Sequence, residues 1–256
     1  MKKLSLFFGL ILWLSCLPGI ANSSLVGYWK FNESSGTIVY DRSSSGQNGT
    51  LAGTVGTPTW NAYGKFGFCL DFDPTDIQYI LVEEDPGGVT NPLNKISVCT
   101  WIRFDDGTNV KTIIYRKGSY CLRVTAGEAP SFNVYTTSWD NADGDVSSMV
   151  VNTWYFVVGT FDGTTIQVFL NGNLVASETH SNPGNTVQTQ YHLYIGRWST
   201  ATDPFAGKLD EIRIYDNILT SSEVLILYKN GRIGWNTSSW GQKSWRTVPW
   251  KVIPWE

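Results

Sequence analysis

Short runs of alternating hydrophobic and polar residues fill most of the chain. They are rich in β-branched and aromatic residues and are separated by Gly, Asn, Asp and Ser, a pattern typical of strands and turns. It predicts strands at residues 25–31, 66–72, 79–83, 96–104, 111–116, 120–125, 131–135, 154–161, 164–170, 173–178, 192–197 and 207–215. Since each alternating strand has one apolar face, so many strands need two packed sheets, which predicts an all-β sandwich.

Local signals add two hairpin turns and one helix. Asp162-Gly163 and Asn171-Gly172 accept the positive φ that tight turns demand, so residues 154–178 are predicted to form a three-stranded meander. Thr220 and Glu223 have the spacing of a capping box before apolar positions 224, 225 and 227, and Gly231 follows as a stop. One short C-terminal helix is therefore expected over residues 221–230, as a cover on the sandwich.

Composition narrows the class of protein. Aromatic residues make up 14% of the chain and charged residues only 16%, against about 25% in an average soluble domain. These values argue against a coiled coil, a helical repeat or a disordered chain. The formal net charge of −3 gives no basic field for nucleic acid, and two His exclude a His-rich metal cluster.

Three segments differ in character. Residues 1–21 read as a signal peptide, because two Lys precede an apolar run shorter than the roughly 20 residues of a membrane span. Residues 22–231 form the acidic body, with 21 acidic and 13 basic residues. Residues 232–256 form a tail with four basic residues, one acidic residue and Trp at every fifth position from 235 to 255. We expect an exported protein without a membrane span. Its tail is either a segment that docks on its own body, on a partner, on a cell-envelope polymer or on a membrane surface, or a low-complexity tail without a role.

Export into an oxidising compartment affects whether the cysteines form a disulfide. Cys69, Cys99 and Cys121 remain once the signal peptide is removed, and an oxidising compartment favours one disulfide between two of them. Each also stands in an apolar alternating run, so three buried core thiols fit the sequence equally well.

Several motifs, taken together and in order, resemble the laminin-G-like family of concanavalin A-like domains. They are Leu25–Gly36, Asp41–Thr50, Gly64–Asp73, Val98–Ile102, Asn152–Gly163 and Gly207–Tyr215, followed by the capped helix. The resemblance covers residues 25–231 and implies a two-sheet antiparallel jelly-roll sandwich. It also implies a secreted, non-catalytic module that binds an extracellular glycan or surface protein. Trp29, Trp101 and Trp154, mid-strand in apolar surroundings, are assigned to the core.

Calcium is the expected ligand of the loop from Asp41 to Gly49, which offers carboxylate, amide and backbone oxygens. In domains of the family, a structural calcium often ties this early loop to the closing strand. The resemblance therefore implies Asp41, Asn48 and Asp210 as metal ligands. The alternative is that Asp41 is a turn residue that binds its own backbone.

A glycan is expected at a rim of the sandwich. The loop at residues 139–145 holds Trp139 beside three carboxylates, Asp140, Asp143 and Asp145, and Trp198 stands in a similar position before another loop. Aromatic rings pack against the C–H face of a sugar, and carboxylates accept its hydroxyl groups. A solvated surface loop is the alternative for residues 139–145.

Two other functions compete with a binding module. A sandwich-fold glycosidase or polysaccharide lyase would need a convergent set of catalytic residues, and no paired-carboxylate spacing, nucleophile elbow or phosphate loop stands in the sequence. A structural cell-surface protein that assembles through its Trp-rich tail is the third possibility. We therefore expect a non-catalytic protein.

Overall fold

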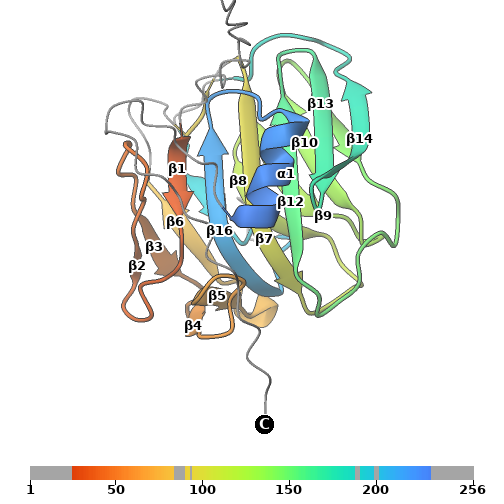
Figure 1. The fold of residues 1–256 in the computed structure, drawn as a ribbon. Helices are drawn as coiled ribbons and strands as arrows, with labels where there is room; N and C mark the ends of the chain where they lie inside the picture. The colour runs from red at the N-terminus through yellow and green to blue at the C-terminus, as the bar shows by residue number, and fades with distance from the viewer. Residues whose placement is uncertain (1–24, 84–89, 93, 188–190, 199–201, 232–256) are drawn as a thin grey trace, which may run out of the picture.

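The structure is a computed structural model that describes residues 25–83, 90–92, 94–187, 191–198 and 202–231 (Figure 1). The predicted signal peptide (1–21) and Trp-rich tail (232–256) lie outside these ranges. Within them, no helix is long and apolar enough to cross a membrane.

Two antiparallel sheets face each other, as the sequence predicts. Sheet A has the order β14-β13-β12-β7-β16-β5-β4, with β1 also paired to β16. Sheet B has the order β11-β10-β9-β8-β15-β6-β3-β2. The strands of sheet A are β1 (Leu25–Trp29), β4 (Thr59–Asn61), β5 (Cys69–Phe72), β7 (Ile96–Phe104), β12 (Tyr155–Phe161), β13 (Thr165–Leu170), β14 (Asn173–Thr179) and β16 (Gly207–Tyr215). Those of sheet B are β2 (Ile38–Val39), β3 (Gly49–Ala52), β6 (Tyr79–Val82), β8 (Lys111–Arg116), β9 (Tyr120–Val124), β10 (Pro130–Tyr135), β11 (Trp139–Asp143) and β15 (Leu193–Ile195).

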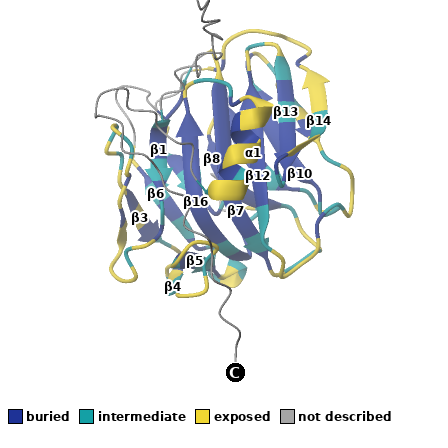
Figure 2. Ribbon diagram, viewed as in Figure 1, coloured by how far each residue is buried: buried dark blue, intermediate teal, exposed yellow. Residues whose placement is uncertain are grey.

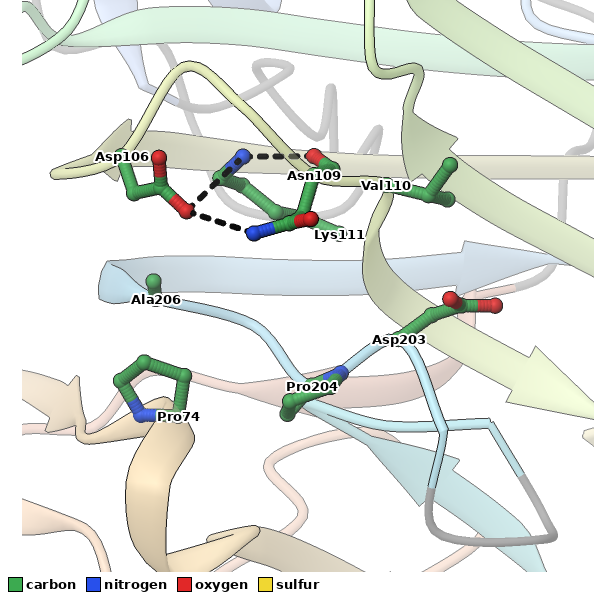
Figure 3. A pocket seen from close by; sticks show the side chains of 8 residues that line it. All are labelled: Pro74, Asp106, Asn109, Val110, Lys111, Asp203, Pro204 and Ala206. Atoms are coloured by element: carbon green, nitrogen blue, oxygen red, sulfur yellow. Dashed lines mark hydrogen bonds and ion pairs between the residues drawn. The ribbon is translucent and has the colours of Figure 1, made fainter.

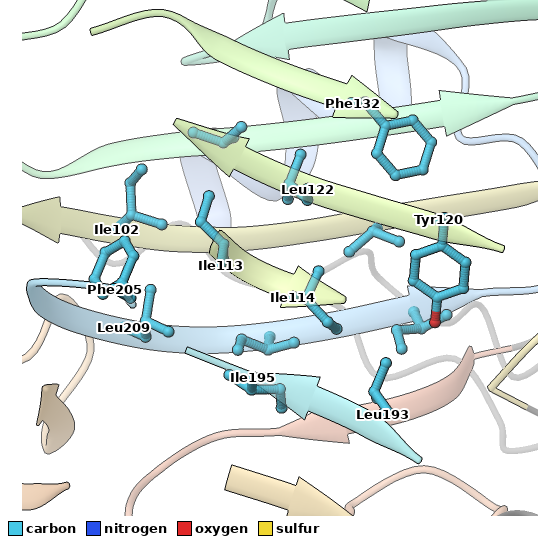
Figure 4. Packing of buried hydrophobic residues seen from close by; sticks show 14 of the residues in the cluster. Ile102, Ile113, Ile114, Tyr120, Leu122, Phe132, Leu193, Ile195, Phe205 and Leu209 are labelled. Atoms are coloured by element: carbon cyan, nitrogen blue, oxygen red, sulfur yellow. The ribbon is translucent and has the colours of Figure 1, made fainter. Parts of the chain in front are cut away.

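The main core fills the space between the sheets (Figure 4). Ile102 and Leu209 of sheet A lie opposite Leu122, Phe132 and other apolar side chains of sheet B. Alternate residues on each strand reach this core, since successive side chains of a strand point to opposite faces. The remaining residues of sheet B therefore line a face turned away from the core.

The predicted meander is confirmed. Strands β12, β13 and β14 pair in sequence, and the turn between the last two places Asn171 at φ 50° and Gly172 at φ 87°. Positive φ at both central residues matches the right-handed twist of the two strands, which is why Asn-Gly marks such turns.

Helix α1 (Ser221–Asn230) lies on the outer face of sheet A (Figures 1 and 2). Thr220 and Glu223 form the predicted capping box, and Gly231 ends the helix at φ 66°. Val224 and Leu227 of the helix pack in a second apolar cluster that includes Trp101 and Phe156 of sheet A. Sheet A thus buries apolar residues on both of its faces.

The three Trp residues assigned to the core occupy different places. Trp29 belongs to the main core between the sheets, whereas Trp101 lies in the second cluster under α1. Trp154 is only partly buried and packs against that second cluster, because it precedes β12 at the edge of the area that α1 covers.

The helix contact gives a stability prediction. We expect Leu227→Ala to lower the free energy of unfolding by about 2 kcal/mol, since the Leu227 side chain is fully buried beneath the helix. Leu225→Ala, at a neighbouring position that is 37% exposed, should cost less than half of that. Urea denaturation of the two variants compares them directly. If both variants lost the same unfolding free energy, α1 would not cover the second cluster.

Cys69, Cys99 and Cys121 are free and buried. No disulfide joins any two of them, and the structure agrees with the alternative prediction of three core thiols. Cys69 and Cys99 belong to sheet A, whereas Cys121 belongs to sheet B. Burial raises the pKa of all three thiols to about 12, which keeps them protonated and unreactive.

Candidate functional site

The outward face of sheet B carries a row of register partners that runs across six strands. The row consists of Leu81, Tyr194, Tyr115, Cys121, Asn133 and Asn141. Their neighbours along the strands, such as Leu122 and Phe132, belong to the main core, so the row points the other way. Strand pairing thus gathers aromatic and amide side chains on one surface.

Four aromatic rings meet on this face, and we call them the aromatic platform: Tyr115, Tyr135, Trp139 and Trp198. Trp198 stacks on Tyr115 with ring centroids 3.9 Å apart, and it lies 6.0 Å from Trp139. Trp139 lies 5.3 Å from Tyr135, its partner across the β10–β11 pair. The Trp139 side chain is 38% exposed, so the platform presents open ring surface to a ligand.

Polar side chains border the platform. The Arg123 Nε donates to Ser131 Oγ at 3.5 Å, and that hydroxyl donates to Asn133 Oδ1 at 3.1 Å. The amide oxygen of Asn133 is thus engaged, and its N–H₂ group is the remaining donor of a side chain that is only 8% exposed. Asn141, exposed on the edge strand β11, is the register partner of Asn133.

A second stacked group extends the same face. The Arg197 guanidinium lies 3.7 Å from the ring centroid of Tyr79 and 4.7 Å from that of Tyr194. Tyr194 is also the register partner of Tyr115, so this group adjoins the platform. Arg197 and Trp198 are adjacent in sequence, and one short segment after β15 therefore contributes to both groups.

The acidic residues predicted to bind a sugar are divided between the two faces of β11: Asp143 shares the outward face with Trp139, whereas Asp140 does not. Asp140 pairs with the core residue Val134 and therefore points away from Trp139. Its carboxylate accepts a hydrogen bond from the Ser181 backbone N–H at 2.6 Å and lies 3.2 Å from His180 Nδ1. The hydrogen bonds from Ser181 lower the pKa of Asp140, which indicates a structural use of this carboxylate.

Most of the segment predicted as a loop is the edge strand β11. Three of its five residues are polar and most are exposed, and its two apolar residues, Trp139 and Ala142, do not alternate, so the strand lacks the hydrophobic pattern that identifies a strand in a sequence. Asp143 closes the strand opposite Ser131, and Asp145 lies in the exposed segment that follows. The prediction of a loop over residues 139–143 was wrong for that reason.

The predicted calcium ligands have other partners. The Asp41 carboxylate accepts four hydrogen bonds of 2.8–2.9 Å, from the backbone N–H groups of Tyr28, Ser43 and Gln47 and from the Ser43 hydroxyl. These donors use the four lone-pair sites of a carboxylate. Asn48 Oδ1 accepts the Asp41 backbone N–H at 2.9 Å. Asp41 is thus a turn residue, as the alternative interpretation has it.

Asp210 lies apart from that loop, in the middle of β16. It is fully buried; Oδ2 accepts the Phe66 backbone N–H at 2.8 Å, and Oδ1 has no partner among the described residues. Burial raises the pKa of this carboxyl to about 8. No contact within the described ranges joins Asp210 to Asp41 or Asn48, so the three residues do not fit a ready-made calcium site. In the same ranges, no three His, Cys, Asp or Glu side chains gather closely enough to hold a metal ion.

A cavity of about 250 Å³ opens at one end of the sandwich (Figure 3). It lies between the β7–β8 loop, the short 3₁₀ helix η1 (Pro74–Asp76) and the segment before β16. Its lining residues are Pro74, Asp106, Asn109, Val110, Lys111, Asp203, Pro204 and Ala206. The Lys111 ammonium is buried in its wall, donates to the Asn109 backbone carbonyl at 2.6 Å and lies 4.0 Å from Asp106.

Sequence reasoning identified Trp139 and Trp198 as separate candidates, and the structure brings them together. It missed Tyr115, Arg123 and Asn133, which hold outward positions on β8, β9 and β10. The alternation within each strand could have marked them as outward-facing, but only the strand pairing shows that they share one surface.

Comparison with known proteins agrees with this architecture. The family model described as the concanavalin A-like lectin/glucanases superfamily matches residues 78–225, which is more than half of the chain. The chain belongs to this superfamily. No curated protein matches the sequence.

Solved structures share the concanavalin A-like fold at low sequence identity. Domain 4 of AbnA, an extracellular GH43 arabinanase of Geobacillus stearothermophilus solved in complex with arabinotriose, has a TM-score of 0.64 at 21% identity. The match covers 80% of this chain and 98% of that domain. The binding domain of botulinum neurotoxin DC in complex with SialylT has a TM-score of 0.61 at 15% identity, over 82% of this chain and 52% of that one. The binding domain of Paraclostridial Mosquitocidal Protein 1 has a TM-score of 0.63 at 14% identity. That match covers 80% of this chain and 52% of the other.

Proposed function

We propose that this protein is an exported, non-catalytic module that binds a glycan on the outward face of sheet B. The observation that carries the proposal is the meeting of Trp139 and Trp198, 6.0 Å apart, in the aromatic platform. Amide and guanidinium donors of Asn133 and Arg123 border the platform. Aromatic surface beside a few fixed polar groups is the usual composition of a small-molecule site.

The chemistry of a sugar explains the pairing of these residue types. The C–H groups on one side of a sugar ring are apolar and pack against an aromatic face, whereas the hydroxyl groups around its edge both donate and accept hydrogen bonds. The arabinanase domain of similar fold was solved with arabinotriose bound, which supports a carbohydrate as the ligand. Export is supported by the character of residues 1–21.

A glycan array with the full mature chain tests the proposal. We expect retention of one or more oligosaccharide classes and no release of shorter products from them. An array on which no glycan is retained would contradict the proposed function. Release of shorter products would mean that the protein is a glycosidase or lyase.

A structural calcium ion stays a prediction. Asp41 and Asn48 would have to exchange their present hydrogen bonds for the metal, and Asp210 would have to reach them. If calcium binds the folded form in this way, a hundredfold excess over its dissociation constant should add about 2.7 kcal/mol of stability. Melting temperatures measured with calcium and with a chelator should then differ by several degrees, and Asp210→Ala should remove the difference. Identical melting curves would exclude the site.

A further inference from the structure

We propose that Asp203 is a specificity residue that makes the glycan site select uncharged sugars over anionic ones. Its carboxylate would accept sugar hydroxyls at the boundary between the outward face of sheet B and the terminal cavity. The inference rests on the proposed function and adds the ligand class to it.

Asp203 lies between the terminal cavity and the outward face of sheet B. It lines the cavity, while its backbone carbonyl accepts the Thr112 N–H of β8 at 2.9 Å. Its charge also contributes to the raised pKa of the Cys121 thiol, in the middle of the outward row. In Figure 3 the Asp203 carboxylate points away from the Asp106 and Lys111 side of the cavity. The residue therefore belongs to the mouth of the cavity, on the side of the outward face.

The backbone of Asp203 is held in place, while its carboxylate has no partner among the described residues. Among the described residues no side chain or backbone group donates to it, although the residue is only partly exposed. Its backbone adopts φ 50°, a left-handed conformation that Asp and Asn tolerate better than most residues. An acceptor without a partner, on a backbone held at the edge of a cavity, is suited to a ligand hydroxyl.

Charges of both signs lie on this face, with Arg123 and Arg197 on one side of the balance and Asp203 on the other. Asp203 accepts the backbone N–H of Thr112, and Thr112 is the register partner of Arg123, so Arg123 and Asp203 lie on the same part of the sheet. A hydroxyl can accept from the guanidinium and donate to the carboxylate, and so satisfies both. A sugar carboxylate could pair with Arg123, but it would be repelled by Asp203.

The cavity adds a further negative charge. Hydrogen bonds from Thr108 lower the pKa of Asp106, so this carboxylate is ionised at neutral pH. The described lining holds two carboxylates, Asp106 and Asp203, and one ammonium, Lys111, which is a formal net charge of −1. An anionic sugar residue would therefore gain nothing by entering it.

Titration calorimetry with four trisaccharides tests the inference on the full mature chain. The neutral probes are arabinotriose, xylotriose and cellotriose, and the anionic probe is trigalacturonate. We expect the best neutral probe to bind at least tenfold more tightly than trigalacturonate. Asp203→Asn, which tolerates the same backbone conformation, should reduce that ratio about fivefold or more.

Glu178→Gln is the matched control, because it removes one negative charge from the exposed edge strand β14 of the other sheet. It should leave the ratio unchanged. Binding of trigalacturonate as tight as that of the best neutral probe, or a ratio unchanged in Asp203→Asn, would overturn the inference while the proposed function stands. Failure of all four probes, together with an array that retains no glycan, would overturn both.

Discussion

Trp139→Ala is expected to weaken binding of the best array ligand by roughly 30- to 100-fold, a loss of about 2–3 kcal/mol. Trp139 is 38% exposed and meets the rings of Tyr135 and Trp198 at tilted angles, so its removal should leave the fold almost unchanged. Trp198→Ala should have an effect of similar size, because it removes the ring stacked on Tyr115.

Tyr63→Ala is the control for this prediction. The Tyr63 side chain is 83% exposed and lies between β4 and β5 of sheet A. Its loss removes an exposed aromatic ring from a different surface and should leave affinity unchanged. Equal affinities of wild type and Trp139→Ala, measured by calorimetry, would mean that the ligand does not bind on the platform.

The buried carboxyl of Asp210 should make stability fall as pH rises. Its pKa is about 8 in the folded protein and near 3.8 in the unfolded chain, so between these values the folded protein holds a proton that the unfolded chain has lost. Stability is therefore greatest at low pH within this window and decreases by up to ~1.4 kcal/mol per pH unit. We expect urea denaturation to show a loss of roughly 2–4 kcal/mol between pH 5 and pH 8.

Asp210→Asn should remove that slope, because the amide does not titrate while its oxygen can still accept the Phe66 N–H. Asp105→Asn, at an exposed position, should keep the wild-type slope. The same slope in wild type and Asp210→Asn would show that the Asp210 carboxyl is ionised in the folded protein throughout this range.

The local sequence pattern was sufficient to predict most strands of the fold and its helix. The strands predicted at residues 96–104, 111–116 and 207–215 have the observed bounds, because long apolar alternation and turn residues mark their ends. The capped helix at residues 221–230 was equally clear from Thr220, Glu223 and Gly231. Strands β2, β3, β4 and β11 were not predicted, since they are short or polar and their pairing is decided by neighbours far along the chain.

The candidate site was predictable only in part. Exposed Trp residues beside polar loops are recognisable in a sequence, which is how Trp139 and Trp198 were found. Their proximity depends on sheet order, because β8 pairs with β15 across nearly eighty residues of intervening chain. The interpretation of Asp140 failed because one step along a strand reverses the direction of a side chain.

The central claim is that a glycan binds on the aromatic platform, and the Trp indole N–H signals of a ¹⁵N-labelled sample report on it directly. Signals of Trp139 and Trp198 can be assigned from Trp→Phe variants, and the sample is then titrated with the best oligosaccharide from the array. We predict that these two indole signals shift with the ligand while that of Trp29, in the main core, stays in place. A titration that shifts other indole signals and leaves Trp139 and Trp198 unchanged would contradict the claim.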